Sequence, residues 1–314
     1  MALRKLLIAN RGEVAVRVAR AAADLGIATV AIHSQDDAAS LHVHVADEAL
    51  PLSGRGVPAY LDGTEIVRLA RAAGCDSIHP GYGFLAESAA FARACEEGGL
   101  RFVGPAVETL ELFGDKLRAR AAAAAQDVPV LPGTDAPTSA GQAAAFFAGL
   151  PAGSAMMIKA VAGGGGRGTR AVRSADQVAA AFERCRSEAQ GAFGDGALYV
   201  ERMVTRARHV EVQILGDGTE VVQVGERECS AQRRHQKLVE IAPAPGLTGA
   251  LRARIIDAAK RVADAAGYRG LGTFEFLVDM DDPGDDSEDG SGDAAAFYFV
   301  EANPRLQVEH TVTE

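Results

Sequence analysis

Polar side chains of chemically distinct types alternate in one short segment near the end of the sequence, residues 299–309 (FVEANPRLQVE). They occupy every second position from 301 onward: Glu301, Asn303, Arg305, Gln307 and Glu309. Alternate residues of an extended strand point to the same side. If the segment stays extended, we therefore expect a row of polar groups over an apolar backing.

Each polar type in this row suits a particular chemistry. Glu301 and Asn303 offer the hard oxygen ligands that Mg²⁺ prefers. Arg305 and Gln307 can hold a small planar anion, because a guanidinium pairs with two carboxylate-like oxygens at once. Glu309 can accept a proton. The alternative is the solvated face of an amphipathic strand, but that alternative does not explain why these types occur in this order.

A single small anion cannot contact both ends of the row if the strand is straight. Four residues of extended chain separate Arg305 from Glu309 by about 13 Å. If both act on one substrate, the chain must bend, and we expect the break between Leu306 and Glu309. Pro304 is compatible with this because proline is confined to edge or bent strands.

Glu275 is a further candidate metal ligand, on a predicted strand over 273–279. It lies between Phe274 and Phe276. An ionised glutamate buried without a partner is costly, and a bound metal would account for it. The alternative is a surface-facing Glu275 with both phenylalanines turned to the core.

A glycine-rich turn is the best candidate for phosphate binding. Gly163, Gly164, Gly165 and Gly166 follow a predicted strand that carries Lys159. Glycine N–H groups can close over an anion because no Cβ is in the way, although a flexible hairpin tip is the alternative. A P-loop is excluded because its lysine would follow the glycines. Lys116 supplies another cation at a helix start, where phosphate is favoured.

Two further strips are weaker signals for an anionic ligand. His209, Glu211 and Gln213 share one face of an otherwise apolar strand. Residues 230–240 gather five polar or basic residues in an acidic chain: Gln232, Arg233, Arg234, His235 and Lys237.

The first hundred residues must position these groups through an alternation of short apolar strands and amphipathic helices. Strands are expected at 5–9, 27–32, 76–79 and 100–103, with helices at 13–25, 65–73 and 88–97. This rhythm predicts a mostly parallel sheet covered on both faces, similar to a Rossmann half. The first turn reads Asn10-Arg11-Gly12-Glu13, so a dinucleotide site is poorly supported.

The remainder of the chain predicts two further units. The second has helices at 115–126, 138–148 and 175–190, an extended linker at 128–135, and strands at 156–161, 169–172 and 198–201. The third is antiparallel, with strands at 208–215, 220–226, 273–279 and 296–303 and a helix at 251–266. Its last two strands are joined by the acidic segment 281–294, which we expect to be a surface loop.

Composition narrows the function classes. The chain has 314 residues, of which 48% are hydrophobic and 24% charged, which excludes disorder. It has no apolar stretch near the roughly 20 residues of a membrane span and no signal peptide. The net charge of −10 argues against nucleic acid as a partner. Four scattered cysteines fit a reducing cytoplasm and argue against a zinc cluster.

The ordered motifs together resemble the biotin carboxylase family. These are ATP-grasp enzymes that also occur as modules of acyl-CoA, pyruvate and urea carboxylases. The resemblance covers nearly the whole chain through the motifs NRGEVAVR, HPGYGFLAES, GGGGRG, RHVEVQ, ERECSAQRRHQK, GTFEF and EANPRLQVEHTVTE.

The resemblance implies a fold, a reaction and partners. The fold would be α/β, with a Rossmann-like domain over 1–113, an ATP-grasp linker and mobile glycine-rich lid over 114–203, and a truncated α+β C-terminal domain over 204–314. The reaction would be ATP-dependent carboxylation of biotin on a carrier protein, using bicarbonate through carboxyphosphate. Partners would be the biotin carboxyl carrier, a carboxyltransferase and, in the full-length protein, a second copy.

The resemblance also implies site residues. Those for ATP are Lys116, Lys159, Gly163, Gly164, Gly165, Gly166, Glu201, His209, Gln232 and His235, with Glu201 and the neighbouring backbone holding adenine. Those for Mg²⁺ or Mn²⁺ are Glu275, Glu301 and Asn303. Bicarbonate would be held by Lys237, Arg305, Gln307 and Val308. Glu309 would be the base, with Arg305 and Lys237 the other catalytic residues.

Departures from the family leave alternatives open. The acidic loop 281–294 is longer than the family's hairpin, and the family continues for more than a hundred residues past Glu314. Another ATP-grasp carboxylate ligase, or a nucleotide-binding fragment without turnover, therefore remains an alternative. The sequence does not identify the final acyl acceptor.

Overall fold

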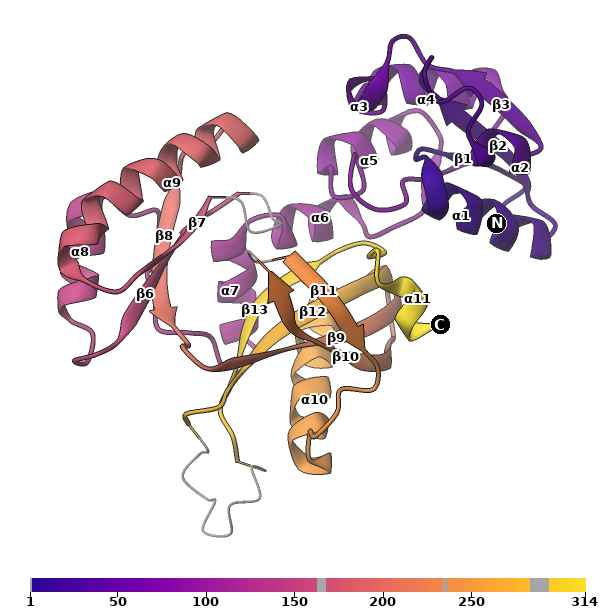
Figure 1. The fold of residues 1–314 in the computed structure, drawn as a ribbon. Coiled ribbons are helices and arrows are strands. Elements are labelled where there is room, and N and C mark those ends of the chain that lie inside the picture. The colour runs from indigo at the N-terminus through magenta and orange to yellow at the C-terminus, as the bar shows by residue number, and fades with distance from the viewer. Residues whose placement is uncertain (1, 163–167, 234–235, 283–293) are drawn as a thin grey trace.

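The computed structural model describes residues 2–162, 168–233, 236–282 and 294–314. Three sheets follow one another along the chain (Figure 1), and each has its own hydrophobic core. The predicted fold class, α/β followed by antiparallel α+β parts, is confirmed. Of the described helices, none is long and apolar enough to cross a membrane.

The first sheet is parallel throughout and ordered β3-β2-β1-β4-β5. Its strands are β1 (Lys5–Ile8), β2 (Ala28–His33), β3 (Glu48–Pro51), β4 (Ser77–His79) and β5 (Arg101–Phe102). The helices around it are α1 (Gly12–Asp24), α2 (Leu41–Val45), α3 (Gly56–Ala59), α4 (Gly63–Ala72), α5 (Ala89–Glu97) and α6 (Val107–Phe113). Leu6 and Ile8 face one hydrophobic cluster and Leu7 faces the other, as alternation in a sheet covered on both faces requires.

The second sheet is antiparallel and ordered β7-β6-β8. It consists of β6 (Ala155–Ala160), β7 (Thr169–Val172) and β8 (Leu198–Met203). The helices α8 (Ala140–Ala148) and α9 (Val178–Phe193), the latter preceded by the 3₁₀ turn η1 (Ala175–Gln177), pack against it. The glycines of 163–167, which connect β6 to β7, lie outside the described residues.

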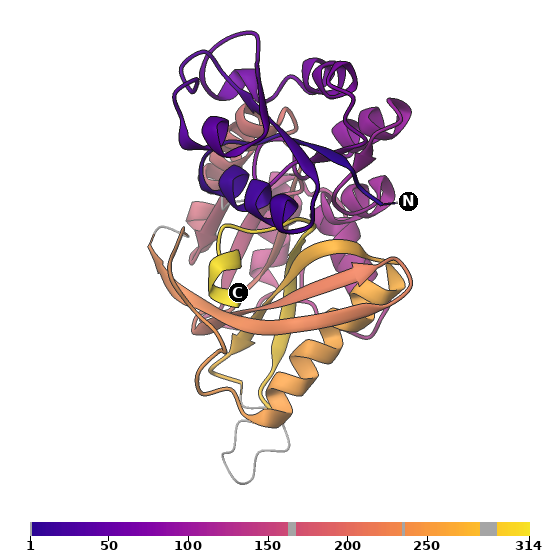
Figure 2. The same ribbon diagram turned by 90° about the vertical axis from the view of Figure 1, so that its right-hand side faces the viewer.

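The third sheet is antiparallel and ordered β11-β10-β9-β12-β13. Its strands are β9 (Ala207–Asp217), β10 (Val221–Arg233), β11 (Gln236–Ile241), β12 (Arg269–Asp279) and β13 (Phe297–Asn303). The helices α7 (Lys116–Ala124) and α10 (Gly249–Ala265) contribute to its core. Figure 2 shows this curved sheet beneath the first unit, with α10 on its outer side.

The two faces of the third sheet have opposite chemistry. Phe274 and Phe276 enter the hydrophobic core. Phe274 packs edge-on against Phe113, and Phe276 packs edge-on against the phenylalanines at 297 and 299. Glu275 therefore points to the opposite face of the sheet. This agrees with the alternative in which both phenylalanines face the core, but Glu275 is buried and does not face solvent. Glu211 and Gln213 of β9 are buried with it.

The predicted extended linker joins the second and third sheets. Val130 pairs with Phe299 of β13, and Gly133 pairs with Glu201 of β8. The Phe299 N–H donates to the carbonyl of Pro129 at 2.8 Å. The linker thus fixes where the second sheet attaches to the third.

The expected polar row over 301–309 is wrong beyond Asn303. The strand β13 ends at Asn303, and the Arg305 N–H turns back to the Asn303 carbonyl at 2.8 Å. The strand ends before Pro304, earlier than the predicted interval, and the chain turns again at residues 308–309, within that interval. A short helix, α11 (His310–Thr313), follows Glu309.

Several strand limits also differ from the prediction. The strand β10 continues to Arg233, whereas the prediction ended it at Glu226. The prediction was too short because an irregularity between Gln223 and Glu226 interrupts the two-residue period. The strand β11 was not predicted, because its residues form a basic and apolar mixture without clean alternation. The elements β3, α2, α3, α6 and α11 were also missed, since each is too short to show a period.

Gly272 provides a test of the third sheet's packing. A Cβ at this position would lie 2.1 Å from the Tyr268 hydroxyl, which is held by the Leu271 carbonyl. We expect Gly272→Ala to destabilise the protein by about 1–3 kcal/mol and to lower its melting temperature. Gly249→Ala at the start of α10, where no atom lies within 4 Å of the added methyl, is the control and should not. Equal melting temperatures for the two variants would contradict this packing.

Candidate active site

A cavity of about 720 Å³ lies where the three units meet. Most of the predicted site residues line it: Lys116, Lys159, His209, Gln232, Lys237, Glu275, Glu301, Asn303, Arg305, Gln307, Val308 and Glu309. Tyr82 and Gly83 of the HPGYGFLAES motif also line it. The predicted residues His235 and Gly163 to Gly166 lie outside the described part of the chain. The fold thus brings together, around one cavity, side chains as far apart in sequence as Lys116 and Glu309.

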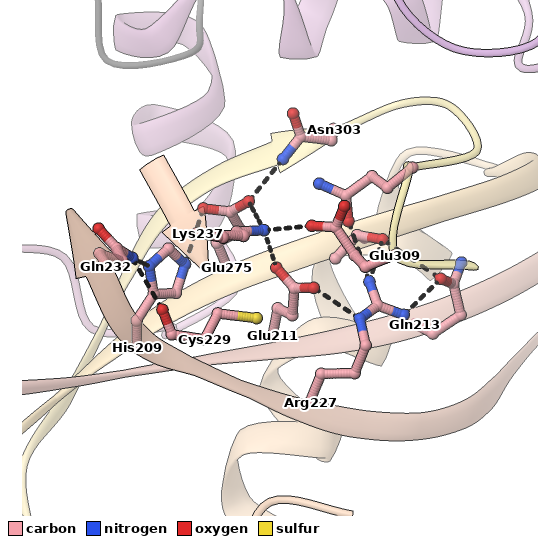
Figure 3. A network of polar contacts seen from close by, with 12 residues as sticks. His209, Glu211, Gln213, Arg227, Cys229, Gln232, Lys237, Glu275, Asn303 and Glu309 are labelled. Carbon is pink, nitrogen blue, oxygen red and sulfur yellow. Dashed lines mark hydrogen bonds and ion pairs between the residues drawn. The ribbon is translucent and has the colours of Figure 1, made fainter. Parts of the chain in front are cut away.

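Lys237 of β11 is the centre of the cavity's charge network (Figure 3). Its ammonium lies 2.5 Å from Glu211 Oε2, 2.6 Å from Glu309 Oε1 and 3.3 Å from Glu275 Oε1. Burial alone would lower the pKa of Lys237, but the surrounding carboxylates, Glu275 first, raise it above its ordinary value. Lys237 is therefore a fixed cation among three carboxylates.

Glu275 is held ionised by its neighbours. Burial would raise its pKa, but His209 and Lys237 together bring that pKa well below its ordinary value. The His209 ring nitrogen Nε2 lies 2.8 Å from Glu275 Oε2, and Asn303 Nδ2 donates to Oε1 at 2.9 Å. Burial opposes protonation of His209, yet the Glu275 charge raises the pKa of the imidazole. Gln232 contacts the other ring nitrogen at 2.9 Å and fixes the ring.

Glu301 lies directly opposite Glu275 in the pairing of β13 with β12. Burial raises its pKa, and Lys116, 3.8 Å from Oε2, only partly opposes this. Glu275 is buried, whereas 23% of the Glu301 side chain is exposed. A divalent cation between these neighbouring carboxylates would supply the positive charge that Glu301 lacks. The predicted ligands Glu275, Glu301 and Asn303 therefore fit Mg²⁺ or Mn²⁺.

Another group of possible ligands is already neutralised by protein cations. Donor atoms of His209, Glu211 and Glu275 lie within 4.8 Å of one another. However, Glu211 gives one oxygen to Arg227 at 2.6 Å and the other to Lys237 at 2.5 Å. Glu275 belongs to both groups and is itself paired with His209 and Lys237, so the groups differ in Glu211, whose two oxygens are paired at short distance, and in Glu301, which lies 3.8 Å from Lys116. Glu301 is therefore the better partner for Glu275 in a metal site.

The side chain of Glu201 lies between two protein cations. Its carboxylate is buried between Lys159 Nζ at 2.5 Å and Arg120 Nη1 at 3.1 Å, and it is outside the cavity lining. Burial would lower the pKa of Lys159, but Glu201 raises it above its ordinary value. The side chain of Glu201 thus holds Lys159 as a cation toward the cavity, and contact of adenine with Glu201 and its neighbouring backbone stays a prediction.

The turn after β13 is fastened to the first unit. The Arg305 guanidinium lies 3.1 Å from Glu87, in the HPGYGFLAES motif. His310 of α11 lies 3.4 Å from Glu13 of α1, whose other oxygen accepts from the Tyr82 hydroxyl at 2.7 Å. These contacts place Glu309, between Arg305 and His310 in the chain, at the junction of two units.

Sequence reasoning missed Arg227, Arg120 and Glu87. Arg227 lies within the motif ERECSAQRRHQK, one residue beyond the end of the predicted strand 220–226. A longer β10 would have placed its side chain on the same face as Glu211. Arg120 and Glu87 gave no separate signal, because each finds its partner across units far apart in sequence.

A parallel-sheet unit followed by a three-stranded and a five-stranded antiparallel sheet, with lysines and paired carboxylates between them, defines the ATP-grasp class. Residues 2–110 match the family described as "Biotin carboxylase, N-terminal domain". Residues 115–314 match "Carbamoyl-phosphate synthase L chain, ATP binding domain". The chain belongs to the biotin carboxylase family, and the resemblance noted in the sequence is confirmed.

Relatives of known sequence include large multidomain proteins. The chain is 48% identical to pyruvate carboxylase of Staphylococcus aureus over 99% of its own length. It is also 48% identical to mitochondrial pyruvate carboxylase of Mus musculus, again over 99%. In both cases it spans only 26% of the relative, about a quarter of the whole protein.

Solved structures give the same family. The biotin carboxylase domain of Hydrogenobacter thermophilus 2-oxoglutarate carboxylase, in complex with MgADP, ADP and bicarbonate, matches with a TM-score of 0.92 and 41% identity. This match covers all of the chain and 66% of that domain. The biotin carboxylase of Campylobacter jejuni, in a β,γ-ATP complex, matches with a TM-score of 0.92 and 40% identity, covering all of the chain and 68% of that protein.

The paired carboxylates give a direct test of metal binding. We expect Glu301→Gln in the full-length protein to weaken Mn²⁺ binding, in the presence of ADP, by about tenfold or more, because the charge of a ligand is lost while its shape is kept. Electron paramagnetic resonance of free Mn²⁺ measures this. Glu183→Gln, an exposed position on α9 paired with Arg186, is the control. Unchanged Mn²⁺ affinity in Glu301→Gln would contradict the assignment.

Proposed function

We propose that this chain is the nucleotide- and bicarbonate-binding part of a biotin carboxylase, which carboxylates biotin on a carrier protein at the expense of ATP. The observation that carries the proposal is the single cavity. It holds lysines suited to phosphate, opposed carboxylates suited to a divalent metal, and the Lys237–Glu309 pair beside Arg305. The family neighbour described with MgADP and bicarbonate supports the same ligands for this chain.

The first step would be proton transfer from bicarbonate to Glu309. The resulting oxyanion attacks the γ-phosphorus of ATP, the bond to the β–γ bridging oxygen breaks, and ADP and carboxyphosphate form. Lys116 and Lys159, which line the cavity, would neutralise charge on the phosphoryl oxygens. A divalent cation held by Glu275 and Glu301 would supply further positive charge at the same oxygens.

The second step would transfer the carboxyl group to biotin. Carboxyphosphate breaks down to CO₂ and phosphate, a base takes the proton of biotin N1, and the nitrogen attacks CO₂. The carrier of that biotin would be a biotin carboxyl carrier protein or domain. A carboxyltransferase would then pass the group to an acceptor that this chain does not select.

The relatives support a proposal about the larger protein to which this chain would belong. We propose that it acts within a larger carboxylase, because it spans about a quarter of relatives named pyruvate carboxylase. The full-length protein would be a homo-oligomer, as in the neighbour described as a domain dimer. We place it in the cytoplasm and propose domains at 1–113, 114–203 and 204–314, noting that α7 packs with the third sheet.

The reaction itself is the first test. The full-length protein should hydrolyse ATP in a manner that depends on both bicarbonate and free biotin. Glu309→Gln should lower that turnover by about 100-fold or more while an ATP analogue still binds, because the general base is lost. A different ATP-grasp ligase would show no dependence on biotin, and a nucleotide-binding fragment would show binding without turnover. Either result would contradict the proposal.

Arg305 provides a second test, which separates charge from geometry. Arg305→Lys keeps the charge but loses the planar fork that can hold two oxygens of one anion. We expect kcat/KM for bicarbonate to fall about tenfold or more, with ATP binding retained. Arg261→Lys on α10, paired with Asp257 at the surface, is the matched control. A normal kcat/KM in Arg305→Lys would mean that Arg305 does not hold bicarbonate.

A further inference from the structure

Arg227 is a buried cation next to the cavity that has no part in the proposed chemistry. It lies on β10 and is only 1% exposed. It is outside the cavity lining, so it does not reach a ligand directly. An arginine buried this completely is costly unless all of its donors are used.

The guanidinium of Arg227 joins four separate segments of the third unit. Its Nε donates to Glu211 Oε1 at 2.6 Å, and Nη1 donates to Gln213 Oε1 at 2.9 Å (Figure 3). Nη1 also reaches the Thr313 hydroxyl of α11 at 2.6 Å. Nη2 donates to Gln307 Oε1 at 3.0 Å and contacts the Thr273 hydroxyl at 3.3 Å.

The contact with Gln307 fixes the direction of an amide. A guanidinium has donors and no acceptor, so it binds the oxygen of the Gln307 side chain and not its NH₂ group. Gln307 is 5% exposed, yet it lines the cavity. With the amide oxygen turned to Arg227, the NH₂ group remains to serve as a donor on the cavity side, which is what an anion requires.

The contact of Arg227 with Glu211 affects Lys237, which lines the same cavity. Glu211 is completely buried and shares its two oxygens between Arg227 and Lys237. Without Arg227, the full charge of Glu211 would be directed at Lys237. With Arg227 present, more of the Lys237 charge remains for Glu309 and for an anion beside it.

We propose that Arg227 is a positioning residue for bicarbonate recognition, which acts from behind the site by orienting the Gln307 amide as a donor and by sharing Glu211 with Lys237. This inference rests on the proposed function, since it takes bicarbonate as the anion beside Gln307. It predicts that the geometry of the guanidinium matters as well as its charge.

The main experiment compares two Arg→Lys variants of the full-length protein. Arg227→Lys keeps a cation for Glu211 but cannot span Glu211 and Gln307 together. We expect its KM for bicarbonate to rise about tenfold or more while its KM for ATP changes less than about twofold. Arg252→Lys, which alters the pair with Glu226 near α10, is the matched control and should change neither.

A second comparison does not depend on Arg227 variants folding. Gln307→Glu keeps an oxygen for Arg227 but replaces the donor toward the cavity by an acceptor. Gln307→Met removes both. If the amide presents its NH₂ to the anion, Gln307→Glu should raise the KM for bicarbonate more than Gln307→Met does. In a Gln307→Met background, Arg227→Lys should add much less to that KM than it adds alone.

The outcomes separate this inference from the proposed function. Wild-type protein without bicarbonate-dependent ATP turnover would overturn both. Wild-type turnover with a normal bicarbonate KM in folded Arg227→Lys would overturn the role of Arg227 alone. If Arg227→Lys does not fold, Gln307→Glu with a bicarbonate KM equal to or below that of Gln307→Met would overturn it.

Discussion

The structure depends on one balance of buried charge, in which the ammonium of Lys237 lies among the carboxylates of Glu211, Glu275 and Glu309. Such carboxylates repel one another and could not be buried together without cations. Lys237 contacts all three carboxylates, while Arg227 also pairs with Glu211 and His209 also pairs with Glu275. The strand β11, the turn after β13 and the face of β9 and β12 must therefore meet at this point for the third unit to be stable.

Much of the site could be predicted from sequence because strand alternation places side chains reliably. His209, Glu211 and Gln213 share one face of β9, and Glu275 faces away from the phenylalanines beside it, as two-residue periodicity requires. The family motifs then supplied roles for residues whose chemistry alone left several readings. The lining of one cavity by Lys116, Lys237 and Glu309 depends on contacts between elements far apart in sequence, which no local pattern encodes.

The errors have physical causes that differ from place to place. Alternation was extended past Asn303, although Pro304 cannot donate a backbone hydrogen bond to continue the pairing. The pairing of Glu201 with Arg120 and Lys159 could not be predicted, because these partners lie on other elements. Arg227 was overlooked because an irregularity in β10 hides the period that would have extended the strand.

The uninterrupted pairing of β9 with β12 has a consequence for how this sequence can change over evolution. The two strands pair from Arg269 with Asp217 to Asp279 with Ala207 without a bulge. Inserting or deleting one residue within either strand would exchange its two faces, so that Phe274 would enter the charged side and Glu275 the hydrophobic core. We therefore expect changes in length to fall in connections beyond these limits, such as the one between β12 and β13, which contains the acidic segment 281–293.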